Sequence, residues 1–217
     1  AQYREGRTEL DEDGREVHDS GMLHAVFTRT RFGEQVRHQS WIAYEYTALQ
    51  ALHAAGVDVP RPYEMAHNAI LMDYLGDESL PAPTLNEIDL EPGEAAPLFE
   101  RLLHNLNLML DCGRVHGDLS AYNVLYWDGD PLLIDFPQVV SPQNNRGAYA
   151  IFERDMTRLC AYFTAQGLTL QPRRLAQGMW QAHGYPLEAD IPQELLDNDS
   201  QTTPADPPQH KPWMGIL

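Results

Sequence analysis

The chain has 217 residues, of which 43% are hydrophobic and 22% charged, a composition typical of a water-soluble fold with a buried core. Its formal net charge of −17 repels phosphate backbones, so direct nucleic-acid binding by this portion is not expected. No apolar run reaches the roughly 18 residues that a membrane span needs, and residues 1–5 show no signal region, so we expect a cytoplasmic protein without a membrane partner.

The N-terminal part predicts a linker, a helix and two short strands. Residues 1–22 are polar and rich in turn formers, and we expect a charged linker or loop there. Apolar side chains spaced three and four residues apart predict a helix over 38–55, which Gly56 ends. After a proline-containing extended stretch, strands are expected at 63–66 and 69–74.

The C-terminal part alternates helices with one hairpin. An apolar face predicts a helix over 96–111, and the turn signal Asp128-Gly129-Asp130 predicts a hairpin of strands 124–127 and 132–135. Two further helices are expected at 149–166 and 171–182. The acidic, proline-rich residues after Pro186 predict a poorly ordered tail.

The segment from Val115 to Gln138 carries the chemistry. A loop presents His116, Asp118 and Asn123, and the apolar run after the hairpin ends in Asp135. Phosphoryl transfer to a hydroxyl needs a carboxylate that orients the acceptor and takes its proton, and oxygen ligands for the Mg²⁺ that bridges the phosphates. Asp118 suits the base, and Asn123 and Asp135 suit the metal ligands. These residues could instead be ordinary turn and strand-end residues, but four motif elements in the right order favour the site.

The same residues resemble the RIO atypical protein kinases. The resemblance rests on H-G-D-L-S-x-Y-N from His116, on I-D-F-P-Q from Ile134, and on Ser120, because typical eukaryotic kinases have lysine at that position. It extends to M-D-Y-L-G from Met72, which is similar to the RIO hinge, and to W-x-x-x-E from Trp41, which is similar to the regulatory helix.

The resemblance implies roles for particular residues. Asp118 would be the catalytic aspartate, with Asn123 and Asp135 holding Mg²⁺ and the latter able to accept a phosphoryl group itself. Asp73 and Leu75 would offer backbone groups to the adenine of ATP.

Five further residues would have binding or supporting roles by the same resemblance. Met72 would lie at the back of the nucleotide pocket, and Glu45 would pair with the lysine that grips the phosphates. His116 would hold the catalytic loop, to which Ser120 also belongs, and Asp155 would accept hydrogen bonds from the backbone of that loop. Met72 could equally fill the core, and Glu45 and Asp155 could be solvated helix carboxylates.

The resemblance implies an α+β, protein-kinase-like fold with a mostly helical C-terminal lobe. We expect a linker over 1–22, a partial N-terminal lobe over 23–75, a C-terminal lobe over 76–186 and a tail over 187–217.

Two features of kinases are missing from the printed sequence. It contains no glycine-rich loop, and its fourteen arginines stand against a single lysine, Lys211 in the tail. We therefore expect both features to precede Ala1 in a longer protein, and the 217-residue chain alone to bind ATP·Mg weakly without turnover. Arg31 or Arg37 could substitute for the missing lysine.

Three functions are compatible with these residues. The first is an ATP-dependent serine protein kinase or ATPase of RIO type, with a protein or ribosome-associated acceptor. The second is a small-molecule phosphotransferase of the aminoglycoside or choline kinase kind, which also uses H-G-D loops. The third is a kinase fold that only binds a partner, which the missing lysine favours and the intact Asp118, Asn123 and Asp135 disfavour.

Overall fold

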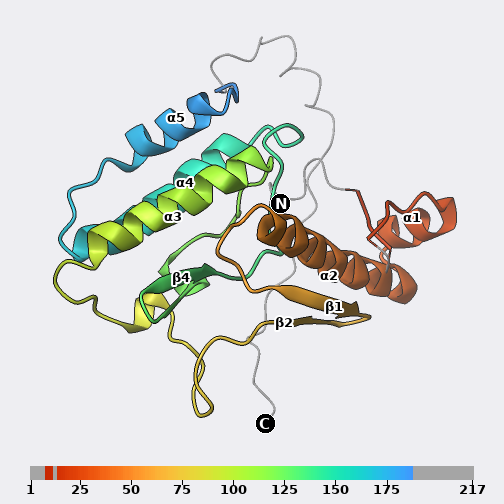
Figure 1. The fold of residues 1–217 in the computed structure, drawn as a ribbon. Helices are drawn as coiled ribbons and strands as arrows, with labels where there is room; N and C mark the ends of the chain where they lie inside the picture. Colours follow the sequence, from red (N-terminus) through yellow and green to blue (C-terminus); the bar gives the residue numbers. More distant parts are fainter. Residues whose placement is uncertain (1–7, 12–13, 188–217) are drawn as a thin grey trace.

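The computed structural model of the chain describes residues 8–11 and 14–187 (Figure 1). The predicted tail lies outside the described residues, apart from its first residue. Helices and strands alternate irregularly along the chain: α1 (Ser20–Phe27), α2 (Arg31–Ala54), β1 (Pro62–Ala66), β2 (Ala69–Met72), α3 (Ala95–Asp111), β3 (Val124–Trp127), β4 (Asp130–Leu133), α4 (Ala148–Ala165) and α5 (Pro172–Ala182). The mixture of helices and small sheets confirms the predicted α+β class.

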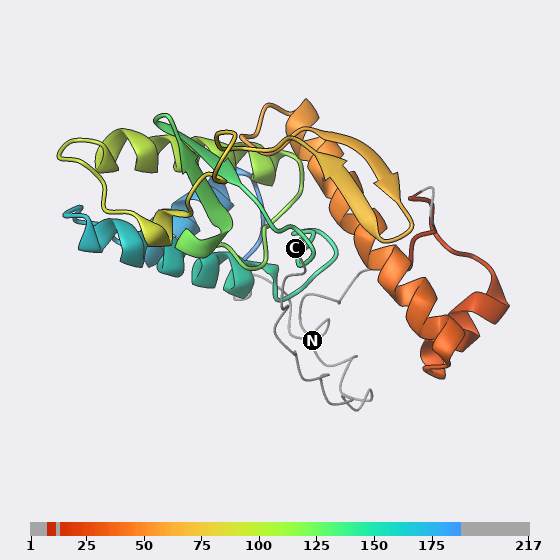
Figure 2. The same cartoon turned by 90° about the horizontal axis from the view of Figure 1, so that it is seen from below.

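The elements form two lobes that lie on opposite sides of the molecule in Figure 2. Figure 2 shows α1, α2 and the β1–β2 hairpin on one side, with α3, α4, α5 and the β3–β4 hairpin on the other. Helix α2 contacts both β1 and β2, so it packs against the hairpin whose second strand ends at Met72. The larger lobe is mostly helical, as expected.

The β3–β4 hairpin follows from its turn residues. The strands pair antiparallel from Val124 with Leu133 to Trp127 with Asp130, which leaves Asp128 and Gly129 as the two loop residues. Both have positive φ angles, 55° and 91°, as a type I′ turn requires. Because the loop uses only two residues, β4 begins and ends earlier than predicted. Asp135, predicted to close the strand, lies two residues beyond it with a φ of 67°, which no strand residue adopts.

The N-terminal part also differs from the prediction. Helix α2 begins at Arg31 instead of residue 38 because the Thr30 hydroxyl caps it, accepting a hydrogen bond from the Gly33 N–H at 3.0 Å. The predicted linker over 1–22 is wrong at its end, since Asp19 caps α1 in the same way and the helix begins at Ser20. Leu10 is buried and forms a bridge with Glu16, so this stretch packs on the fold.

One apolar core runs through both lobes and positions the loops between them. It includes Leu49 and Leu52 of α2, Leu102 of α3 and Met156 of α4. A polar link accompanies it where the extended segment after α2 meets α3: the Asp58 carboxylate accepts hydrogen bonds of 2.6 and 2.8 Å from the Arg101 guanidinium. The lobes are therefore joined by packing as well as by the chain itself.

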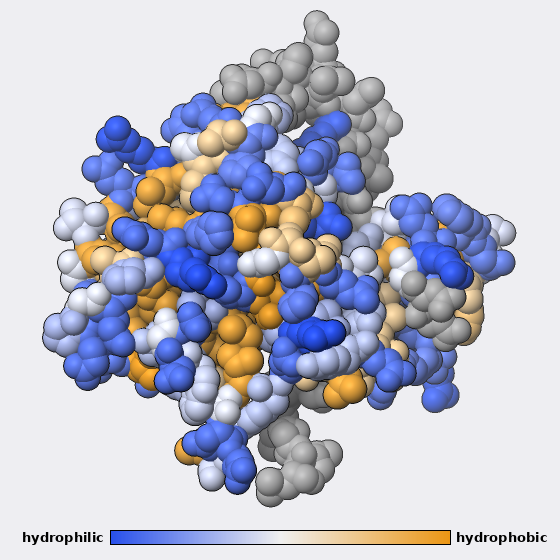
Figure 3. All heavy atoms as spheres, in the orientation of Figure 1, coloured by the Kyte–Doolittle hydropathy of each residue, from blue (hydrophilic) through white to orange (hydrophobic). Residues whose placement is uncertain are grey.

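The surface matches the acidic, polar composition. In Figure 3 the α1 end of the molecule is mainly hydrophilic, while apolar side chains show toward the middle of the view, over the larger lobe. Across the part of the chain that the structure describes, no helix is both long and apolar enough to cross a membrane.

Candidate active site

His116 ties two loops together at the base of the candidate site. It is buried, and its Nε2 lies 3.0 Å from the carbonyl oxygen of Ile134. Its ring also packs on Phe136, with centroids 4.8 Å apart. Ile134 and Phe136 flank Asp135, so His116 fixes the backbone on both sides of that aspartate relative to its own loop.

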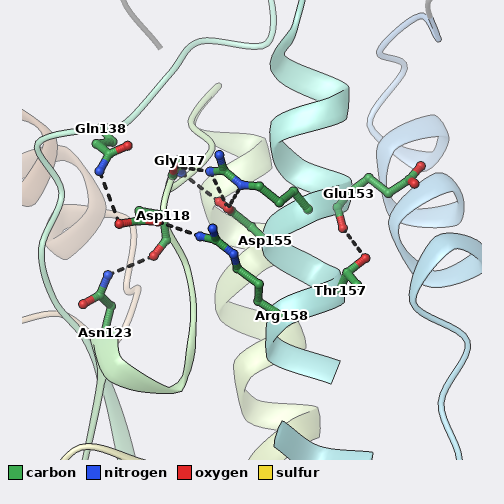
Figure 4. A network of polar contacts seen from close by, with 9 residues as sticks. Gly117, Asp118, Asn123, Gln138, Glu153, Asp155, Thr157 and Arg158 are labelled. Atoms are coloured by element: carbon green, nitrogen blue, oxygen red, sulfur yellow. Dashed lines mark hydrogen bonds and ion pairs between the residues drawn. The ribbon is translucent and has the colours of Figure 1, made fainter. Parts of the chain in front are cut away.

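Helix α4 supports the same loop from below. The Asp155 carboxylate, almost fully buried, accepts a hydrogen bond of 2.9 Å from the Gly117 N–H, and Arg154 donates to the Gly117 carbonyl (Figure 4). Burial raises the pKa of Asp155 to about 6, against the lowering effect of Arg154 and of the backbone N–H groups of Gly117 and Leu119. The structure thus places Asp155 where the resemblance put it, beneath the loop and bonded to its backbone.

Both carboxylate oxygens of Asp118 have partners. The Arg158 guanidinium lies 2.7 Å from Oδ1, and the Gln138 amide donates to Oδ2 at 3.2 Å (Figure 4). The Asp118 side chain is about one third exposed, at 35%. The carboxylate is therefore held from two directions while part of it faces solvent.

Asn123 links Asp118 to the strand that leads to Asp135. Its side-chain N–H donates to the Asp118 carbonyl at 2.9 Å, and its own carbonyl accepts from the Ile134 N–H at 3.1 Å. Its backbone N–H donates to the Ser120 carbonyl at 3.0 Å, which closes a one-turn helix, η3 (Ala121–Asn123). The amide oxygen of Asn123 remains as the atom that can face a cation.

The carboxylates around Asp135 repel one another. Desolvation, and then the negative charge of Asp118, raise the pKa of Asp135. Burial and the charge of Asp135 raise the pKa of Glu45 on α2, while a hydrogen bond from the Phe136 N–H acts in the opposite direction. Among the described residues no group of three or more His, Cys, Asp or Glu side chains could hold a metal by itself. The site therefore offers one amide oxygen and one carboxylate as ligands, and Asp135 lies between the negative charges of Asp118 and Glu45.

The segment that resembles the RIO hinge, residues 72–76, keeps two backbone groups open. The Asp73 N–H donates to the Arg61 carbonyl, and the Leu75 carbonyl accepts from the Ala82 N–H at 2.9 Å. The Asp73 carbonyl and the Leu75 N–H have no hydrogen-bond partner within the described ranges. Met72, half-buried at the end of β2, packs against the core.

Two arginines considered from the sequence lie away from the site. Arg37 donates to the Val26 carbonyl at 2.9 Å, at the α1 end of α2. Arg31 is the first residue of α2, about 15 Å along the helix from Trp41, whose indole N–H donates to the Pro137 carbonyl beside the site. Neither is a substitute for the missing lysine in this arrangement.

Comparison with known proteins identifies the family. The RIO domain model matches residues 2–175. The chain belongs to the RIO family. It is 32% identical over 137 residues to the serine/threonine-protein kinase RIO1 of Caenorhabditis elegans, covering 62% of this chain and 27% of that protein. It is 30% identical over 137 residues to the RIO-type kinase Rio1 of Thermoplasma acidophilum, covering 63% of this chain and 70% of the relative.

A solved RIO structure shows the same fold. The Rio2 kinase of Chaetomium thermophilum, determined as an ADP/Mg²⁺-phosphoaspartate complex, superposes with a TM-score of 0.52 at 20% identity. The match covers 90% of this chain and 63% of that one. The protein-kinase-like fold is therefore confirmed, while the chain spans only about a quarter of the length of the worm relative.

Two site residues were not identified from the RIO motifs. Gln138 belongs to the quoted I-D-F-P-Q motif but had no assigned role, and Arg158 had none either. A signal for Arg158 does exist, because it follows Asp155 by three residues on a helix, and such residues share a face. Basic side chains within one helical turn of Asp155 were therefore candidates to contact the loop that Asp155 supports.

The buried His116 should make stability pH-dependent. Burial lowers its pKa from 6.5 to about 4, so between these values the unfolded chain binds a proton that the folded chain refuses. The stability that comes from keeping His116 neutral is fully present above the unfolded pKa. It is lost as the pH falls, by about 2 kcal/mol between pH ~7.5 and pH ~5. Urea unfolding measures the unfolding free energy of wild type minus that of His116→Gln. We expect this difference to be about 2 kcal/mol smaller at pH ~5 than at pH ~7.5.

The comparison isolates His116 because Asp155, the other strongly shifted group nearby, is present in both proteins. A difference in unfolding free energy that stays constant with pH would mean that His116 is not held in its neutral form.

Proposed function

We propose that this chain carries the catalytic loop and metal ligands of an ATP-dependent RIO-type serine protein kinase or ATPase. The observation that carries the proposal is the meeting of Asp118, Asn123 and Asp135 on two loops. Asn123 bonds to the backbone of Asp118 and, through Ile134, to the strand before Asp135. Asp118 also lies near enough to Asp135 for its charge to raise the pKa of Asp135.

The residues present suit magnesium. Asn123 and Asp135 supply an amide and a carboxylate oxygen, the hard ligands that Mg²⁺ takes in small number before completing its shell with water and phosphate oxygens. Burial, and then neighbouring negative charge, raise the pKa values of Asp135 and Glu45, and a bound cation would offset that charge. Bound with ATP, Mg²⁺ would bridge the phosphates and reduce their charge.

Asp118 would orient the acceptor hydroxyl through its partly exposed carboxylate. In the transfer, the hydroxyl oxygen bonds to the γ-phosphorus, the bond from that phosphorus to the ADP oxygen breaks, and the hydroxyl proton passes to Asp118. Asp155 and His116 would keep the loop in position throughout, because they bond to its backbone and to the segment before Asp135.

The hinge would bind adenine through the Asp73 carbonyl and the Leu75 N–H, one acceptor and one donor that the fold leaves open. Met72 would close the back of that pocket. Glu45, on the face of α2 beside Asp135, would pair with a lysine of the full-length protein, which would lower the raised pKa of Glu45.

The acceptor is proposed from the relatives. Those named above are serine/threonine-protein kinases, and the solved Rio2 kinase carries a phosphoaspartate. A serine of a partner protein, one associated with the ribosome included, and Asp135 itself are therefore the two acceptors that we favour over a small molecule.

Full-length protein incubated with ATP labelled at the γ-phosphate would test this function. We expect label in protein or in released phosphate, and none in an aminoglycoside or choline supplied as acceptor. Label on either small molecule would favour the second class of enzyme. ATP that is bound but never consumed would indicate a binding protein and contradict the proposal.

A further inference from the structure

The candidate catalytic carboxylate is paired with a cation from outside its own loop. Arg158 of α4 reaches the Asp118 Oδ1 at 2.7 Å, one helical turn beyond Asp155 (Figure 4). The Arg158 side chain is 45% exposed and Asp118 35%, so the pair borders solvent where an acceptor would approach.

Arg154, the neighbouring arginine on α4, is committed elsewhere. It donates to the Gly117 carbonyl and to Asp155. The loop itself supplies no cation, since Ser120 stands where typical kinases have lysine. Within the described part of the chain, Arg158 is thus the positive side chain that contacts Asp118.

The two partners of Asp118 differ in what they can do. Gln138 is neutral and its 3.2 Å contact with Oδ2 is the longer one, whereas Arg158 is charged and closer to Oδ1. An acceptor hydroxyl that binds the carboxylate would displace Gln138 at the lower cost, and Arg158 would stay. Arg158 would then fix the direction of the carboxylate and place positive charge beside the phosphoryl group in transit.

We infer that Arg158 is a positioning residue for phosphoryl transfer, supplying from α4 the positive charge beside Asp118 that Ser120 does not supply from the loop. This inference rests on the proposed function. This positioning role differs from a purely structural role of Arg158, because a half-exposed ion pair adds little to the stability of a fold.

Steady-state kinetics of full-length protein would test the inference. Arg158→Gln keeps a hydrogen-bond donor and removes the charge, and we expect kcat to fall by about 10²-fold with little change in the KM for ATP. Arg158→Lys should recover most of the rate. Arg173→Gln is the matched control, because Arg173 of α5 pairs with Glu153 of α4, is 88% exposed and lies outside the site. All three variants should melt within a few degrees of wild type.

A charge relocation sharpens the test. Adding Ser120→Lys to Arg158→Gln returns a cation to the loop, and the double variant should transfer phosphate faster than Arg158→Gln alone. Wild-type rates in Arg158→Gln, while Asp118→Asn is impaired, would overturn this inference and leave the proposed function intact. A loss of rate in Arg158→Gln that follows a loss of thermal stability, with no recovery in either lysine variant, would also overturn it. Absence of transfer by the wild type would overturn both.

Discussion

Asp118→Asn in the full-length protein should slow phosphoryl transfer by about 10²- to 10⁴-fold, the usual loss when a general base is removed. Asparagine keeps the size of the side chain and its contact with Gln138, but it cannot take the acceptor proton. Nucleotide affinity should change little, because Asp118 would face the acceptor while adenine would bind at Asp73 and Leu75. Transfer of labelled phosphate measures the first effect, and titration calorimetry with ADP and Mg²⁺ measures the second.

Asp111→Asn provides the matched control for this experiment. The same substitution is made at the end of α3, where the carboxylate is 66% exposed and its ion-pair partner among the described residues is His183, at 3.2 Å. We expect wild-type turnover from it. Equal rates in Asp118→Asn and Asp111→Asn would remove Asp118 from the mechanism.

The sequence predicted the site well where local motifs determine it. The order His116, Asp118, Asn123 and Asp135 was enough to place these residues together, because a glycine-ended helix, a short loop and a two-residue hairpin leave few paths for the backbone. The contact of Asp155 with the loop followed from the family resemblance. Their catalytic and metal-binding roles stay predictions.

Contacts between distant segments were less predictable. Arg158 meets Asp118 only because α4 packs beneath the loop, and no spacing in the sequence gives the distance between them. The prediction that the strand ends at Asp135 was wrong for a local reason. Asp135 has a left-handed backbone, which a strand residue does not adopt, and β4 ends two residues earlier, at Leu133. The early start of α2 depended on one hydroxyl, Thr30, whose capping role the apolar periodicity does not report.

Gly117→Ala is expected to lower the free energy of unfolding by about 2–5 kcal/mol and to impair transfer with it. The φ angle of Gly117 is 87°, a conformation that costs a residue with a Cβ about 1–2 kcal/mol. A Cβ there would also lie 2.7 Å from the carbonyl carbon of Gln138 and closer still to its oxygen, so one backbone must move, at a further cost of about 1–3 kcal/mol. Urea unfolding measures the sum.

Gly129→Ala separates the two costs. Gly129 has nearly the same φ angle, 91°, but a Cβ there would meet nothing within 4 Å. This variant should lose only the conformational part, about 1–2 kcal/mol, and should keep its rate of transfer because the hairpin turn is remote from Asp118. Since Gly117 holds the loop on Asp155 and Gln138 contacts the Asp118 carboxylate, only Gly117→Ala should shift the catalytic group. Equal destabilisation of the two variants would show that the loop tolerates the clash, and that the approach of Gly117 to Gln138 does not fix the site.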